Sequence, residues 1–353
     1  MNSFVSSHGR FLAALCLLAL GLSSVDCARA DRAQPIGTGR TVQLVTDSAC
    51  QSQISTLLDQ WEADRKGDGW KVLKRIVCTA DARALQTRLQ AVRPDHTFLV
   101  GDGVPFLKVS ANPDGHGARE LVADYKYVQD GQPAPVGAIG RIWFKTQVSA
   151  GVDSMGLYRR YFAKRHTWAE DQAFFGPIVR FADHLSYRPD GAEWAKLVVN
   201  QAPSGRLEHL NLPPEHPDGE LTKLAKSPRL IEVVFSGGQP FANPGGLYYF
   251  GGAADWRGAD PAHPGVGPRV AILGAYGSFL CEIEWADSFL SATLTTSHTL
   301  ASFYDMQGVF PFGKMFSGST IGDCGRLGAQ QGYYLTSVYG DPTLTISKQN
   351  PRQ

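Results

Sequence analysis

Cysteine and histidine are the residues of this chain best suited to nucleophilic chemistry. The chain has six cysteines and nine histidines, and a cysteine nucleophile needs a histidine that shuttles its proton. Cys281 follows a glycine-rich stretch, and His116 or His263 could supply its partner. A rearranged Cys–His site is therefore one hypothesis, although a buried thiol or half of a disulfide is the commoner role for a residue like Cys281.

Other catalytic and metal-binding patterns are missing from the sequence. The chain has no G-x-S-x-G nucleophile elbow, no complete G-x-x-x-x-G-K-S/T phosphate loop and no G-x-G-x-x-G after its first strand. Its histidines show no H-E-x-x-H spacing, its cysteines form no C-x-x-C pair, and no cluster of aspartates indicates calcium. We therefore predict no metal ion and no cofactor.

Strand-like and helix-like stretches alternate along the chain and must position these residues. Strands are expected at 41–46, 72–77, 97–100, 177–181, 207–210, 230–235 and 270–273, and helices at 52–65, 82–92, 155–165, 192–200 and 220–225. A Gly340-Asp341-Pro342 turn is expected to lead into a last strand over Thr343–Ile346. The alternation predicts a parallel sheet with crossover helices, in two α/β halves joined near residues 145–155. Long Pro- and Gly-rich loops at 203–217 and 239–268 are candidate binding loops.

Four short motifs resemble a known family. They are Phe98-Leu-Val-Gly-Asp102, Ala123-Asp-Tyr-Lys-Tyr127, Ile139-Gly-Arg-Ile142 and Val338-Tyr-Gly-Asp-Pro-Thr-Leu344. Their order is similar to that in gingipains, secreted cysteine peptidases of the caspase-like clan, and the resemblance covers about residues 41–347. It implies a caspase-like αβα sandwich with a parallel sheet. The chain would divide into a signal peptide (1–30), an N-terminal α/β subdomain (31–150), a C-terminal caspase-like subdomain (151–347) and a tail (348–353).

The same resemblance implies that the catalytic pair is lost. A peptidase of this family would carry histidine at the end of one strand, where this chain has Gly238, and cysteine at the end of the next, where it has Gly274 or Ala275. Glycine and alanine can neither transfer a proton nor attack a peptide bond. We therefore expect no catalytic residue at these positions, with Cys281 as the fallback nucleophile.

Residues around the expected pocket could still bind a ligand. The resemblance places Asp124 beside a substrate side chain, while a capping role is an equal alternative. Gly237, Gln239 and Tyr276 are further binding candidates at the two strand ends. Arg141 is expected to pair with a buried acid and tie the two halves together.

Composition and the N-terminus set the cellular context. Residues 1–30 contain an apolar stretch after Arg10 and a small-residue exit, which predicts a signal peptide cleaved after Ala30 and a periplasmic or secreted protein without a later membrane span. A net charge of +1 without a basic cluster argues against a nucleic-acid partner. Disulfides are allowed in that compartment, but the sequence leaves the pairing of the remaining four cysteines open: Cys50, Cys78, Cys281 and Cys324.

The sequence thus favours a gingipain-like homologue that binds a peptide or protein without cleaving it. Two alternatives stay open. One is an active cysteine endopeptidase that uses Cys281, and the other is a structural or assembly component of an envelope system. The sequence does not indicate an oligomeric state.

Overall fold

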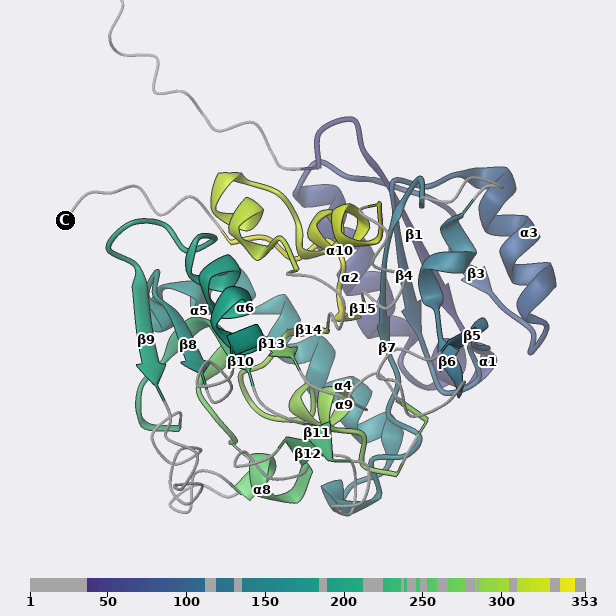
Figure 1. Ribbon diagram of the computed structural model, residues 1–353. Coiled ribbons are helices and arrows are strands. Elements are labelled where there is room, and N and C mark those ends of the chain that lie inside the picture. The colour runs from purple at the N-terminus through teal and green to yellow at the C-terminus, as the bar shows by residue number, and fades with distance from the viewer. Residues whose placement is uncertain are drawn as a thin grey trace, which may run out of the picture.

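A large central sheet dominates the computed structural model (Figure 1). The structure describes residues 37–111, 119–129, 135–183, 189–211, 225–235, 238–239, 246–247, 253–258, 266–276, 283–284, 286–304, 310–330 and 337–346. In this part of the chain the sheet has eleven strands. Their order is β2 (Lys71–Val72), β1 (Thr41–Thr46), β4 (His96–Val100), β7 (Ala138–Ile142), β15 (Ser337–Gly340), β14 (Ala301–Tyr304), β13 (Val270–Tyr276), β10 (Arg229–Phe235), β8 (Val179–Asp183) and β9 (Leu207–Asn211), with β3 (Ile76–Val77) also paired to β1.

The strands run parallel within each half of the sheet, and the two halves run in opposite directions. β15 is parallel to β7 but antiparallel to β14, with Gly340 opposite Ala301. The carboxyl ends of β1, β4 and β7 therefore lie at one edge of the sheet, and those of β8, β10 and β13 lie at the other. Two small antiparallel pairs lie outside the sheet: β5 (Lys108–Ala111) with β6 (Arg119–Val122), and β11 (Gly238–Gln239) with β12 (Gly246–Leu247).

Helices cover both faces of the sheet (Figure 1). The α-helices are α1 (Ser48–Gln53), α2 (Ser55–Gly67), α3 (Ala82–Val92), α4 (Ser154–His166), α5 (Trp168–Phe175), α6 (Pro189–Val199), α8 (Ala253–Gly258), α9 (Phe289–Thr293) and α10 (Ile321–Gln330). The 3-10 helices are η1 (Asp124–Val128), η2 (Val148–Ala150) and η3 (Phe312–Ser317). The fold is thus mixed α/β with a mostly parallel central sheet, as the alternation predicted.

Aspartate side chains cap the N-termini of several of these helices. Asp47 accepts a hydrogen bond from the amide of Cys50, Asp81 from the amides of Arg83 and Ala84, and Asp153 from that of Gly156. Each carboxylate satisfies an amide that has no partner within its helix, and its charge suits the positive end of the helix dipole. Short local signals therefore determine where α1, α3 and α4 begin.

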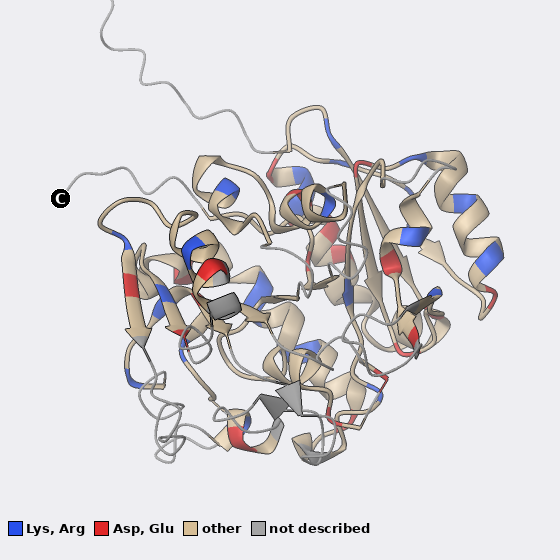
Figure 2. Cartoon of the chain, viewed as in Figure 1, with Lys and Arg blue, Asp and Glu red and all other residues tan. Residues whose placement is uncertain are grey.

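Apolar side chains fill both spaces between sheet and helices. The largest core cluster includes side chains of α2, α4, α8 and α9, a second includes α5, α6 and α10, and a third lies under α3. Lys and Arg are distributed among Asp and Glu over many elements (Figure 2). Among the described residues, we find no helix whose length and hydropathy would suit a bilayer crossing. The predicted signal peptide lies outside the described residues.

A buried carboxylate connects elements from both ends of the chain. Asp341, in the turn after β15, accepts hydrogen bonds from Nε1 of Trp61 and Nε of Arg165, each at 2.8 Å. It also accepts from the backbone amide of Thr343, and its own amide donates to the hydroxyl of Tyr161. Helices α2 and α4 are therefore fastened to the same turn beside the middle of the sheet.

Several predicted elements differ from those observed. The strand expected at 72–77 is two short strands, and the helix expected at 52–65 is split into α1 and α2 at Ile54. The last strand is β15, before the Gly340-Asp341-Pro342 turn, so the prediction of a strand at Thr343–Ile346 was wrong. The helix expected at 220–225 falls largely outside the described residues. The division into subdomains at residue 150 stays a prediction.

Candidate functional site

The two strands expected to carry a catalytic pair are neighbours, but Gly238 lies beyond the end of the first strand, and Gly274 and Ala275 are buried inside the second. β10 and β13 are adjacent and parallel, with Val233 opposite Gly274. Gly274 and Ala275 are inside β13 and are also paired with β14. A Cβ atom on Gly274 would lie 2.2 Å from the ring of Phe303, so the space that a cysteine would need is filled. Gly238 forms part of the small strand β11, while Gly237 and Cys281 lie outside the described residues, as do His116 and His263.

Tyr276 serves the core instead of lining an open pocket. It is 2% exposed, its ring contacts Phe235 and Phe303, and its hydroxyl accepts a hydrogen bond from the amide of Phe310 at 3.0 Å. Gln239 is placed by its backbone in β11. In the part of the chain that the structure describes, the binding candidates Gln239 and Tyr276 therefore do not form a common site.

Asp124 holds a fully buried arginine. Arg141 donates to its two carboxylate oxygens at 2.6 and 2.8 Å and to the carbonyls of Val104 and Pro105. Burial is the largest single effect and disfavours the charged guanidinium, but the attraction and hydrogen bonding of Asp124, with contributions from Tyr127 and Tyr158, together outweigh it, and the pKa of Arg141 is raised. The acid that pairs with Arg141 thus belongs to the same half of the chain, and the pair does not tie the two halves together.

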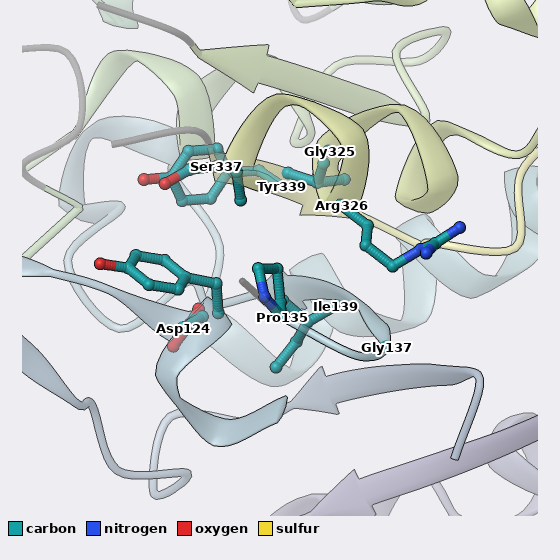
Figure 3. Close-up of a pocket in the computed structure, with 11 residues that line it drawn as sticks. Asp124, Pro135, Gly137, Ile139, Gly325, Arg326, Ser337 and Tyr339 are labelled. Atoms are coloured by element: carbon teal, nitrogen blue, oxygen red, sulfur yellow. The ribbon is translucent and has the colours of Figure 1, made fainter. Parts of the chain in front are cut away.

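A narrow cavity adjoins Asp124 (Figure 3). Figure 3 shows Asp124 at one side of the cavity and the guanidinium of Arg326 at the other. The walls come from η1, β7, α10 and β15, and include Asp124, Tyr125, Pro135, Gly137, Ile139, Gly325, Arg326, Ala329, Ser337, Val338 and Tyr339. Its volume is about 20 Å³, which is room for roughly one water molecule. This cavity is too small for an organic ligand.

A much larger pocket, widely open to solvent, lies between α6 and the outer strands β8 and β9. Its volume is about 430 Å³, within the range of about 300–1,000 Å³ typical of small-molecule sites. We name it the α6 pocket, and the lining residues that the structure describes are Asp183, Ala192, Ala195, Lys196, Val199, Asn200 and His209. Asp183 is the last residue of β8, so the pocket adjoins the carboxyl end of a parallel strand, where ligands of α/β sheets commonly bind.

The polar wall of the α6 pocket is an Asp–His pair. Nε2 of His209 lies 3.1 Å from Oδ2 of Asp183, whose side chain is 0% exposed, while that of His209 is 32% exposed. The imidazole also stacks on Phe181 at 4.8 Å between ring centroids and 20° between planes. The register explains the arrangement, because Phe181 and His209 are paired across β8 and β9. The imidazole is held in one orientation at the pocket wall.

The opposite wall comes from one face of α6. Ala192, Ala195 and Val199 supply methyl groups, and Asn200 after the helix adds an amide. Lys196 donates to Glu193 at 2.7 Å, with both side chains about two thirds exposed at 67% and 71%. The pocket thus combines an apolar surface with a few convergent polar groups, and Lys196, the cation among its described lining residues, is paired with Glu193.

A buried ion cluster lies on the other face of the same strands. Glu232 on β10 is fully buried with Oε2 3.1 Å from Nε of Arg180 on β8. Burial raises the pKa of Glu232 to about 8, although Arg180 opposes the rise. The sequence analysis did not single out either residue, because each occupies one position of an otherwise apolar strand.

The described cysteines are buried or half-buried free thiols. Cys50, Cys78 and Cys324 form no disulfide with one another. Burial is the main cause that raises the thiol pKa of all three, that of Cys78 to about 11. A raised pKa disfavours the thiolate, so these residues are poor nucleophiles. Among the described residues, no group of three or more His, Cys, Asp or Glu side chains could hold a metal ion.

The turn expected at Gly101-Asp102 is present and highly constrained. Gly101 has a φ of 128°, and a Cβ atom there would lie 2.4 Å from the Asp47 carboxylate. Asp102 accepts hydrogen bonds from the hydroxyl of Tyr158 at 2.7 Å and from the amide of Phe144. This turn supports the ends of β4 and β7 through internal hydrogen bonds.

Comparisons with known proteins give no family. No protein-family model and no curated protein matches the chain. Among solved structures, an ABC transporter solute-binding protein from Burkholderia multivorans is 10% identical with a TM-score of 0.23, covering 86% of this chain and 97% of that one. The Escherichia coli transcriptional repressor AscG is 10% identical with a TM-score of 0.22, covering 87% and 99%. A carbohydrate transporter solute-binding protein from Agrobacterium radiobacter, in complex with D-arabinose, is 12% identical with a TM-score of 0.21, covering 89% and 97%.

These findings overturn the predicted resemblance to gingipains. The described positions of the expected pair, Gly274 and Ala275, are filled by core packing, and the solved structures named above are solute-binding proteins and a repressor. Four predictions are therefore withdrawn. They are the caspase-like fold, the gingipain-like homologue that binds peptides or proteins, the endopeptidase using Cys281 and the envelope assembly component. TM-scores this low carry no argument about the ligand or the fold of this chain, so its function has to be argued from its own geometry.

Proposed function

We propose that this protein binds a small organic molecule in the α6 pocket. The observation that carries the proposal is a ligand-sized cavity of about 430 Å³ whose wall contains the oriented Asp183–His209 pair. Concave sites that combine apolar walls with a few placed polar groups are typical of small-molecule binding. The proposal also includes export to the periplasm or beyond, on the basis of the leader-like residues 1–30.

The frame around the pocket supports binding by a largely preformed site. β8 pairs with both β9 and β10 along its length. Phe181 belongs to the second core cluster, and its ring stacks on the imidazole of His209. A ligand would therefore find the polar groups already in place and would not have to order them. Preformed polar groups lower the conformational cost of binding.

The proposal can be tested by measuring ligand binding in a variant whose α6 pocket is filled by a larger side chain. A fragment library of neutral and charged small molecules would be screened against the mature protein by ligand-observed NMR, and hits would be titrated by calorimetry. Ala192→Trp should fill the cavity and weaken hits at least about tenfold, because the indole occupies the space of the ligand. Leu197→Ala on the same helix, where the side chain is 52% exposed, is the matched control and should leave affinity unchanged.

Two results would contradict the proposal. One is a screen without any saturable hit, with the protein shown to be folded by circular dichroism. The other is a set of hits whose affinities stay the same in the Ala192→Trp variant. The second result would place the binding site elsewhere on the protein.

A further inference from the structure

The hydrogen-bonding state of His209 follows from its partner. An ionised carboxylate accepts hydrogen bonds and cannot donate them, so Asp183 requires a proton on Nε2 of the imidazole 3.1 Å away. In the neutral ring the other nitrogen, Nδ1, then carries a lone pair and accepts a hydrogen bond. Within the described part of the chain, Asp183 is the hydrogen-bonding partner found for this ring.

The exposed part of the ring lies at the pocket. Asp183 is inaccessible, whereas 32% of the His209 side chain is exposed and contributes to the cavity wall. Stacking on Phe181 prevents the ring from tilting freely. A ligand in the α6 pocket thus meets the imidazole in a restrained orientation, next to the methyl groups of α6.

Charge in the pocket points to an uncharged ligand. Lys196 is paired with Glu193, and the negative Asp183 is turned toward His209. The rest of the wall that the structure describes is the amide of Asn200 and the apolar side chains of Ala192, Ala195 and Val199. A charged ligand would lose hydration, while every charged group among these described lining residues already has a partner.

We propose that the α6 pocket selects a small neutral alcohol or phenol, whose O–H donates to Nδ1 of His209 and whose apolar body packs on α6. This inference rests on the proposed binding function and adds the chemical class of its ligand. The selectivity arises because an analogue without the O–H would leave the imidazole acceptor buried and unpaired.

Phenol and anisole are a suitable pair of probes, because they share a ring and differ in the O–H donor. Titration of ¹⁵N-labelled wild-type protein should show phenol binding about tenfold more tightly than anisole, with saturable shifts of the His209 ring signals. His209→Phe keeps a ring to stack on Phe181 and should remove this preference. His166→Phe is the matched control, since His166 also pairs with an aspartate, Asp64 at 2.9 Å, but on the surface of α4. It should leave the preference unchanged.

The tautomer can be tested in the wild-type protein and in one variant. The ¹⁵N shifts of His209 should show a protonated Nε2 and an unprotonated Nδ1. Asp183→Asn can donate its amide to Nε2, which moves the ring proton to Nδ1, so the preference for phenol should disappear or reverse. The wild-type spectrum keeps this test valid if that variant does not fold.

The outcomes separate the two proposals. Equal binding of phenol and anisole, both blocked by Ala192→Trp, would leave the binding function standing and overturn the selection of a hydroxyl group. A protonated Nδ1 in the wild-type protein would also overturn it, as would a pocket that binds other fragments but neither probe. Loss of all saturable binding in the α6 pocket would overturn the binding function itself.

Discussion

Nε of Arg165 lies 2.8 Å from Oδ2 of Asp341, although 176 positions separate the two residues in the sequence. Arg65 contributes a second guanidinium, with Nη1 3.6 Å from the same oxygen. Asp341 is 0% exposed and the two arginines are about 5% exposed, so this carboxylate lies between two buried cations, from α2 and α4. Arg65 also pairs with the more exposed Asp68, at 3.1 Å. The contact makes the turn after β15 a point on which both helices depend.

Replacing this carboxylate should destabilise the whole protein. Asp341→Asn leaves Arg165 without a counter-charge and Arg65 with Asp68 alone, 3.1 Å away, and we expect a loss of about 3–5 kcal/mol in the free energy of unfolding. Urea unfolding followed by circular dichroism measures it. Asp64→Asn removes the acid from the more exposed pair with His166 and should cost less than about 1 kcal/mol. Similar losses in both variants would contradict this account.

Gly274 should not tolerate even one added methyl group. Gly274→Ala places a carbon 2.2 Å from the ring of Phe303, and we expect a destabilisation of about 1–3 kcal/mol from overpacking. Gly67→Ala at the end of α2 is the matched control, because a Cβ atom there meets nothing within 4 Å; it should be neutral or stabilise by up to about 1 kcal/mol. Thermal unfolding of the two variants beside the wild type checks the difference. An unchanged melting temperature for Gly274→Ala would show that Phe303 can move aside.

Glu232 should make stability fall as the pH rises. Burial raises its pKa from 4.5 to about 8 in the folded protein, so between these values the folded state keeps a proton that the unfolded state has lost. The stabilisation is fully present below pH 4.5 and is lost as the pH rises through about 8. Glu232→Gln should remove on the order of 2 kcal/mol of this pH dependence. Urea midpoints measured from pH 5 to pH 8 test it, with Glu193→Gln on the surface of α6 as the control. Parallel profiles for wild type and Glu232→Gln would refute the assignment.

His96 should act in the opposite direction. Burial lowers its pKa from 6.5 to about 3, and its Nε2 forms a 2.8 Å hydrogen bond with the hydroxyl of Thr320. Between pH 6.5 and pH 3 the unfolded chain binds a proton that the folded protein does not, so stability is lost as the pH falls through this window. His96→Gln should flatten the decline, while His166→Gln, half-exposed on α4, should not. A decline of equal steepness in all three proteins would argue against this role for His96.

Local sequence patterns were sufficient to predict much of the scaffold. β1, α3 and β10 were expected within one or two residues of their observed ends, since each has a clear apolar period and α3 has a capping aspartate. β15 was missed because it is four residues long and is stabilised by pairing with strands on both sides. Such pairing depends on segments distant in the sequence, which a local pattern does not reveal.

The candidate site was harder to predict for a similar reason. Asp183 and His209 are 26 residues apart, and they meet because β8 and β9 are parallel neighbours in a particular register. Nothing in the spacing of His209 distinguished it from the other histidines. The glycines that suggested a lost catalytic pair have a packing explanation at Gly274, where the ring of Phe303 occupies the space.

The continuity of the sheet determines how the molecule can respond to a ligand. β15 is hydrogen-bonded to β7 on one side and to β14 on the other, so swinging one half against the other would require breaking backbone hydrogen bonds in the middle of the protein. Hinge closure of the kind that encloses ligands between two mobile lobes is therefore unfavourable here. We therefore expect an occupant of the α6 pocket to slow amide exchange near β9 and α6 and to leave the radius of gyration unchanged.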